Sequence, residues 1–128
     1  MRHAAIAAGT ERAVQELERV GFLTVQPEEL RALQSEKSFM QQVVDLARLC
    51  GWLTMHQLDS RGTLAGFPDL VLVKGGRLVF AEVKRETGRL SRRQEHWLAE
   101  LGAVPGITAV VWRPSQWETI VELLTGAK

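Results

Sequence analysis

Apolar residues along the chain follow two different spacings, one typical of helices and one typical of strands. Between residues 36 and 50 the apolar positions recur at helical intervals, and they are Phe39, Met40, Val43, Leu46, Ala47 and Cys50. This spacing places them on one side of an α-helix, and Gly51 is suited to end it. We therefore predict an amphipathic helix over 36–50.

Other helices are indicated by their start signals. Ser91 followed by Gln94 has the spacing of a capping box and predicts a helix over 91–101. A similar pattern predicts a last helix over 115–124. Thr10 and Pro27 suit the first turns of two helices that end near residues 21 and 34. These two helices form an N-terminal extension over residues 1–34.

Four apolar runs have the length and the composition of β-strands. They lie near residues 52–57, 69–74, 77–84 and 107–112. Gly75 and Gly76 separate the second run from the third and predict a hairpin with a two-residue turn. Both faces of this hairpin are apolar, so we expect helices to cover both sides. The predicted fold is α/β, with a mixed central sheet flanked by helices.

Each strand of the hairpin carries a carboxylate where an aliphatic side chain is usual. A turn at Gly75 and Gly76 places Asp69 directly opposite Glu82, and alternation places Lys84 on the same face as Glu82. Opposed residues have Cβ atoms about 4.5–5.5 Å apart, at which like charges repel. A cation between the two carboxylates would remove that repulsion.

A third carboxylate is expected to join this pair. Glu36 lies, by its direction around the helix over 36–50, within the apolar stripe and is predicted to point inward. Three carboxylates and one lysine suit phosphodiester hydrolysis assisted by Mg²⁺ or Mn²⁺, because hard oxygen ligands hold such ions. A favourable interaction of Glu36 with the helix dipole is the alternative explanation for that residue.

Composition narrows the possible partners. The chain has 128 residues, a formal net charge of +1 and one cysteine, Cys50, so it has no internal disulfide. No apolar run is long enough for a membrane span or a signal peptide, and we expect a cytoplasmic protein. Bulk charge does not indicate a polyanion partner, but a local cluster does. The candidate DNA contacts are Arg61, Arg85, Arg89, Arg92 and Arg93.

The motif "PDLVLV…FAEVK" matches the PD-(D/E)xK pattern, and the longer string "GFPDLVLVKGGRLVFAEVKRETGRLSRRQEHWL…VVWRP" resembles the VRR-NUC (virus-type replication-repair nuclease) family. The resemblance covers about residues 35–124 and assigns residues 35–128 to a nuclease domain. It implies a restriction-endonuclease-like core in which Asp69 and Glu82 bind metal, the Val83 carbonyl completes the coordination and Lys84 assists catalysis. Glu36 resembles the helical acid of the family, and Gln94 its helical glutamine.

Two classes of function follow from the resemblance. The first is a metal-dependent endonuclease for branched DNA such as Holliday junctions, acting as a homodimer in DNA repair in a bacterial or phage-infected cell. The second is an inactive nuclease fold that binds DNA or assists assembly. For Gln94 a purely structural role in the capping box is as well supported as a role in the site. The four tryptophans are expected to fill the core rather than to stack on bases.

Overall fold

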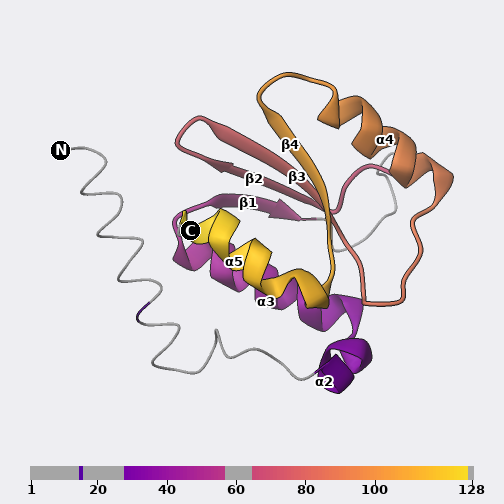
Figure 1. The fold of residues 1–128 in the computed structure, drawn as a ribbon. Helices are drawn as coiled ribbons and strands as arrows, with labels where there is room; N and C mark the ends of the chain where they lie inside the picture. Colours follow the sequence, from indigo (N-terminus) through magenta and orange to yellow (C-terminus); the bar gives the residue numbers. More distant parts are fainter. Residues whose placement is uncertain (1–14, 16–27, 57–64, 127–128) are drawn as a thin grey trace.

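The structure is a computed structural model that describes Gln15, residues 28–56 and residues 65–126 (Figure 1). The helices and strands lie close to their predicted positions. In chain order the elements are α2 (Glu28–Leu33), α3 (Glu36–Leu49), β1 (Leu53–His56), β2 (Leu70–Lys74), β3 (Arg77–Val83), α4 (Arg92–Gly102), β4 (Ile107–Trp112), the 3₁₀ turn η1 (Pro114–Gln116) and α5 (Trp117–Thr125). Of the predicted helix near Thr10 only Gln15 is described, and it is helical; the rest lies outside the described residues.

The sheet has four strands in the order β1-β2-β3-β4. β1, β2 and β3 pair antiparallel, whereas β3 and β4 pair parallel, with α4 in the connection between them. A parallel pair needs such a crossover, because the chain must return to the starting end of the first strand before the second strand begins, and a tight turn joins only antiparallel strands. The sheet is therefore mixed, as predicted.

The hairpin between β2 and β3 has the register expected from the sequence. Its pairs run from Lys74↔Arg77 at the turn to Leu70↔Ala81. Gly75 and Gly76 have φ angles of 55° and 80°, and a turn with two positive φ angles suits the twist of the adjoining strands. The two glycines thus determine which residues of the two strands face each other.

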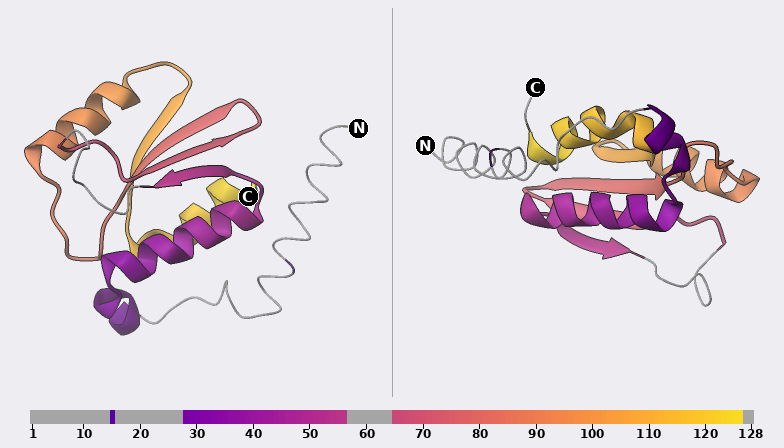
Figure 2. Two further views of the ribbon diagram at one scale, coloured as in Figure 1. Left: turned by 180° about the vertical axis from the view of Figure 1, so that it is seen from behind. Right: turned by 90° about the horizontal axis from the view of Figure 1, so that it is seen from below.

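One face of the sheet is fully covered. α3 and α5 lie side by side along it (Figures 1 and 2), and they bury Leu70, Leu72, Val79 and Ala81. Ser35 begins α3 by accepting a hydrogen bond from the backbone N–H of Ser38. The main core lies between this face and the two helices.

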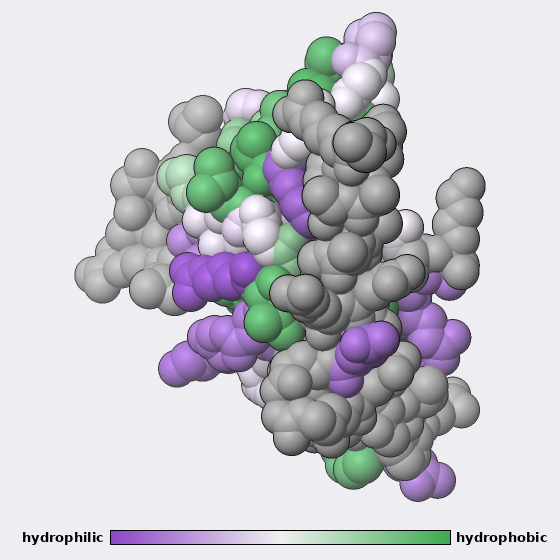
Figure 3. Space-filling view, turned by 90° about the vertical axis from the view of Figure 1, so that its left-hand side faces the viewer, coloured by the Kyte–Doolittle hydropathy of each residue, from purple (hydrophilic) through white to green (hydrophobic). Residues whose placement is uncertain are grey.

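The opposite face is covered only in part, in contrast to the prediction. α4 packs against β4 and part of β3, whereas Leu53 and Met55 of β1 are 73% and 61% exposed. Val73, which pairs with Leu53, is 39% exposed. Apolar side chains reach the surface at this end of the molecule (Figure 3). A single helix of this length covers two strands of a four-stranded sheet and leaves the other two open.

None of the described helices has the length and apolar character needed to cross a membrane.

Candidate active site

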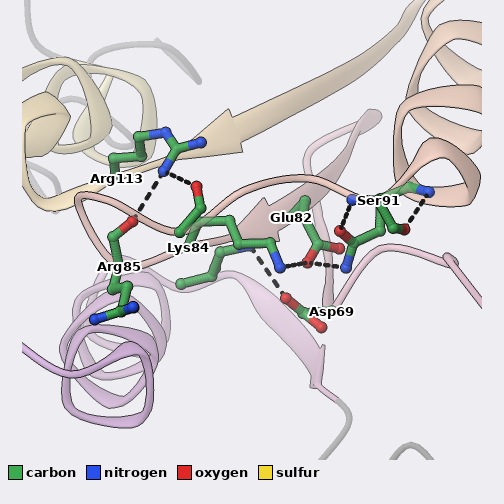
Figure 4. A network of polar contacts seen from close by, with 9 residues as sticks. Asp69, Glu82, Lys84, Arg85, Ser91 and Arg113 are labelled. Atoms are coloured by element: carbon green, nitrogen blue, oxygen red, sulfur yellow. Dashed lines mark hydrogen bonds and ion pairs between the residues drawn. The ribbon is translucent and has the colours of Figure 1, made fainter.

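Two carboxylates and a lysine come together where β2 begins and β3 ends (Figure 4). Asp69 directly precedes β2, and its Oδ2 accepts a hydrogen bond of 3.2 Å from the backbone N–H of Val83. Glu82 lies on β3 beside it, and the Nζ of Lys84 is 3.9 Å from the Oε2 of Glu82. The structure therefore shows the expected register, with Asp69 located just before the strand rather than in it.

Glu82 is the most unusual of these side chains because it is a buried carboxylate. Its exposed fraction is 1%, and among the described residues its Oε1 has no hydrogen-bond partner. The pKa of Glu82 is raised from 4.5 to about 9, mainly by burial and then by Asp69, which repels the ionised form and can share a hydrogen bond with Glu82 only when one of the two is protonated. Lys84 lowers the pKa and Glu36 adds a smaller increase. An ionised Glu82 is therefore costly unless a positive charge is close.

Gln94 has both of the roles that the sequence left open. The side-chain Oε1 of Gln94 accepts a hydrogen bond from the backbone N–H of Ser91 at 2.8 Å, and the backbone N–H of Gln94 donates to the Oγ of Ser91 at 3.1 Å. Its Nε2 donates to the Oε2 of Glu82 at 3.0 Å. The capping box fixes the carbonyl end of the amide on Ser91, and this directs the NH₂ end toward Glu82.

The loop before Asp69 is held against the start of α4. Gly66 has a φ of +89°, and a Cβ on it would lie 2.6 Å from the carbonyl carbon of Arg93. Phe67 packs edge-on against Trp97, with ring centroids 5.1 Å apart and an interplanar angle of 81°. Only glycine permits this close approach, so the loop and α4 are positioned together.

The loop after Lys84 is held by a residue to which the sequence gave no role. The Nη1 of Arg113 donates to the backbone carbonyls of Arg85, Glu86 and Gly88 at 2.9, 3.2 and 2.6 Å. The backbone N–H of Lys84 donates to the carbonyl of Trp112 at 3.0 Å. The only signal in the sequence is an arginine directly after a strand, which is not specific.

The prediction that Glu36 points inward is wrong. Its residue is exposed at the first turn of α3, and the buried positions of that helix begin at Phe39. Among the described residues no group of three His, Cys, Asp or Glu side chains is arranged to hold a metal ion. Glu36 nevertheless lies near enough to affect the pKa of Glu82. Its role as a metal ligand stays a prediction.

The predicted DNA contacts are distributed around the site. Arg85 and Arg89 lie on the loop between β3 and α4, and Arg92 and Arg93 lie in the first turn of α4. All four residues are exposed. Arg61 lies outside the described residues. Two of these four exposed arginines therefore follow Lys84 closely in the chain, and two lie in the same helix turn as Gln94.

The side chains present fit a divalent cation. A buried Oε1 of Glu82 that has no partner among the described residues, next to a second carboxylate, is an unfavourable arrangement that a cation would stabilise. Asp69 and Glu82 supply the hard oxygen ligands that Mg²⁺ and Mn²⁺ prefer. Gln94 and Lys84 occupy only the Oε2 of Glu82 among the described contacts.

Comparison with known proteins gives one match. The VRR-NUC domain matches residues 12–115, a range that includes every described residue of the candidate site and begins within the N-terminal extension. No curated protein and no solved structure matches the chain.

Proposed function

Because the chain belongs to the VRR-NUC family, a family of nucleases with a restriction-endonuclease-like fold, we propose that it is a metal-dependent DNA endonuclease. The observation that carries the proposal is the buried Glu82, whose Oε1 has no partner among the described residues and whose neighbour is Asp69. A purely structural position would place a neutral side chain here, since a buried carboxylate with one unsatisfied oxygen beside a second carboxylate is destabilising. Its presence together with Lys84 and Gln94 supports chemistry on a phosphate.

The residues divide the work as follows. Asp69, Glu82 and the Val83 carbonyl would hold Mg²⁺ or Mn²⁺, with Glu36 as a further ligand. The bound ion would supply Lewis-acid activation of water and charge neutralisation at the phosphate. Lys84, whose side chain is 14% exposed, would stabilise negative charge that develops on the phosphate oxygens. Gln94 would keep Glu82 ionised and correctly oriented by its hydrogen bond.

We propose branched DNA, such as a Holliday junction, as the substrate. The exposed arginines Arg85, Arg89, Arg92 and Arg93 would contact phosphates, which bind the backbone without reading sequence. Two symmetric cuts need two sites, and we therefore propose a twofold homodimer. Light scattering at micromolar concentration tests the dimer, and a protein that stays monomeric on DNA would indicate nicking or flap cleavage instead.

Cleavage of a panel of DNAs tests the proposal. Duplex, flap, splayed-arm and four-way-junction substrates should be cut unequally with Mg²⁺ or Mn²⁺, and a chelator should abolish cleavage. Asp69→Asn and Lys84→Ala should each slow cleavage by about 100-fold or more while DNA binding is retained, because they act on the transition state. Glu122→Gln removes an exposed carboxylate of α5 and serves as the control. A wild type that binds branched DNA but cuts nothing with either metal would instead be a binding module.

A further inference from the structure

A pocket lies beside the first two turns of α4, next to the residue that precedes Gly66. Its volume is about 430 Å³, which is within the range of roughly 300–1,000 Å³ typical of small-molecule sites. It is lined, among the described residues, by Ala65, Arg92, Arg93, His96 and Trp97. The lining is predominantly apolar although three of these five residues are basic. Flat aromatic surface and positive charge are thus combined in one concave site.

The aromatic wall of this pocket is held in place from behind. Trp97 is half-buried, and the Phe67 ring packs against it at 81° with centroids 5.1 Å apart. Phe67 in turn packs on Phe80 of β3, with centroids 6.0 Å apart and an interplanar angle of 88°. Two successive edge contacts therefore connect the Trp97 ring to the sheet. Because the ring is already held in place, a ligand that stacks on it loses little free energy in ordering the side chain.

The pocket and the candidate active site share the same helix turn. Residues 92, 93, 96 and 97 lie on one side of α4, as their helical spacing requires, and Gln94 lies on the neighbouring side, where it donates to Glu82. The close approach of Gly66 to Arg93 fixes the loop that leads into Asp69. The position of the pocket relative to the carboxylates is therefore set by the packing of the loop before Asp69 against the first turns of α4.

We infer that this pocket binds an unpaired nucleobase of the DNA substrate, an inference that rests on the proposed nuclease function. The base would stack on Trp97 and His96, while Arg92 and Arg93 would contact the phosphates on either side of it. A base within a duplex is stacked and paired, so it cannot enter a pocket without being extruded. A nucleotide in a flap or a splayed arm is already unpaired and free to enter, whereas a fully paired four-way junction would have to extrude a base at its branch point. The pocket would therefore select DNA with an unpaired nucleotide near the cut.

Binding measurements in a chelator test the inference separately from cleavage. The probe is a splayed-arm DNA in which each nucleotide of one single-stranded arm is replaced, one at a time, by an abasic site. Base stacking on an aromatic side chain contributes ~1–3 kcal/mol, so we expect one position to weaken binding by roughly 5- to 150-fold. The other positions should have little effect. Because no cleavage is needed, a protein that cuts nothing can still confirm or contradict the pocket.

Variants then locate the effect in the pocket. With Trp97→Leu the loss at the sensitive abasic position should fall to about twofold or less, and with His96→Ala it should fall in part, because the base no longer has its stacking partner. Glu95→Ala, an exposed change on the same helix turn but outside the pocket, is the control and should leave the loss unchanged. Circular dichroism shows whether Trp97→Leu is folded, and if it is not, His96→Ala decides alone.

Two results would overturn the inference. One is an arm in which no abasic position weakens binding, which would leave the arginines as contacts to the DNA backbone only. The other is a position-specific loss that stays undiminished in the folded pocket variants, which would place the unpaired base elsewhere on the protein.

Discussion

The Glu82→Gln variant of the metal-free protein is expected to be more stable than the wild type at neutral pH. Burial and the nearby Asp69 raise the pKa of Glu82 from 4.5 to about 9 in the folded state. A raised pKa means that folding favours the protonated form of Glu82. The contribution of Glu82 to the stability of the wild type is therefore fully present below about pH 4.5, decreases as the unfolded state ionises, and is lost as the pH rises through about 9. Glutamine has no such titration and keeps the acceptor that Gln94 uses.

The size of the effect follows from the interval between 4.5 and neutral pH. That interval spans about 2.5 pH units, and each unit corresponds to about 1.36 kcal/mol, which gives an upper value of about 3 kcal/mol at about pH 7. The attraction of Lys84 is already contained in the pKa of about 9, and partial relaxation of the site reduces the value further, so we expect a gain of roughly 1–3 kcal/mol in the free energy of unfolding.

Denaturant titrations in a chelator at several pH values between about 5 and 9 measure this gain. The difference between variant and wild type should grow with pH, and added Mg²⁺ should reduce it by stabilising the wild type alone. Glu122→Gln, at an exposed position, should show no pH-dependent difference. Parallel stability curves for wild type and Glu82→Gln across this range would refute the reasoning that Glu82 is a destabilising buried acid.

Three further changes test the supports of the site. Gln94→Ala and Gln94→Glu should both slow cleavage by roughly 10- to 100-fold, because both lose the side-chain N–H that donates to Glu82. The glutamate keeps the oxygen that accepts from Ser91, so normal cleavage by Gln94→Glu would leave capping as the only role of this residue. Arg113→Ala removes the donor shared by three carbonyls, of which only that of Arg85 keeps another donor among the described residues, the backbone N–H of Gly88, and it should lower the free energy of unfolding by about 1–3 kcal/mol in denaturant titrations. Arg113→Lys should recover part of the loss, and a variant as stable as the wild type would contradict this. Gly66→Ala should lower the melting temperature more than Gly106→Ala, because both glycines have a similar positive φ but only the first would collide with Arg93; equal losses would show that backbone strain alone matters.

The parts of the structure that were predictable from the sequence depend on local rules. Helical spacing located α3, and the Gly75-Gly76 turn was sufficient to set the register that brings Asp69 beside Glu82. Both rest on residues close together in the sequence, where backbone geometry determines the outcome. The family resemblance used the same short stretch and is confirmed by the match to the VRR-NUC domain.

What the sequence did not predict depends on distant packing. The direction of Glu36 around α3 was inferred from helical spacing, which does not indicate whether other elements cover the first turn of the helix, and Glu36 is exposed there. The contacts of Arg113 join segments more than 20 residues apart, and no local sequence pattern predicts them. Trp97 was expected in the core, but α4 has no fully buried residue, and its tryptophan forms part of a pocket wall instead.

The contacts of Arg113 also determine when, during synthesis, the site can form. Asp69, Glu82 and Lys84 leave the ribosome early, but Lys84 is held by Trp112 and the loop after it by Arg113, which are synthesised later. β4 must first return alongside β3 before these bonds exist. A nascent chain or a fragment that ends before residue 112 therefore carries the acidic residues without the support that orders them. The proposed DNA cleavage should accordingly require a chain that extends at least through Arg113.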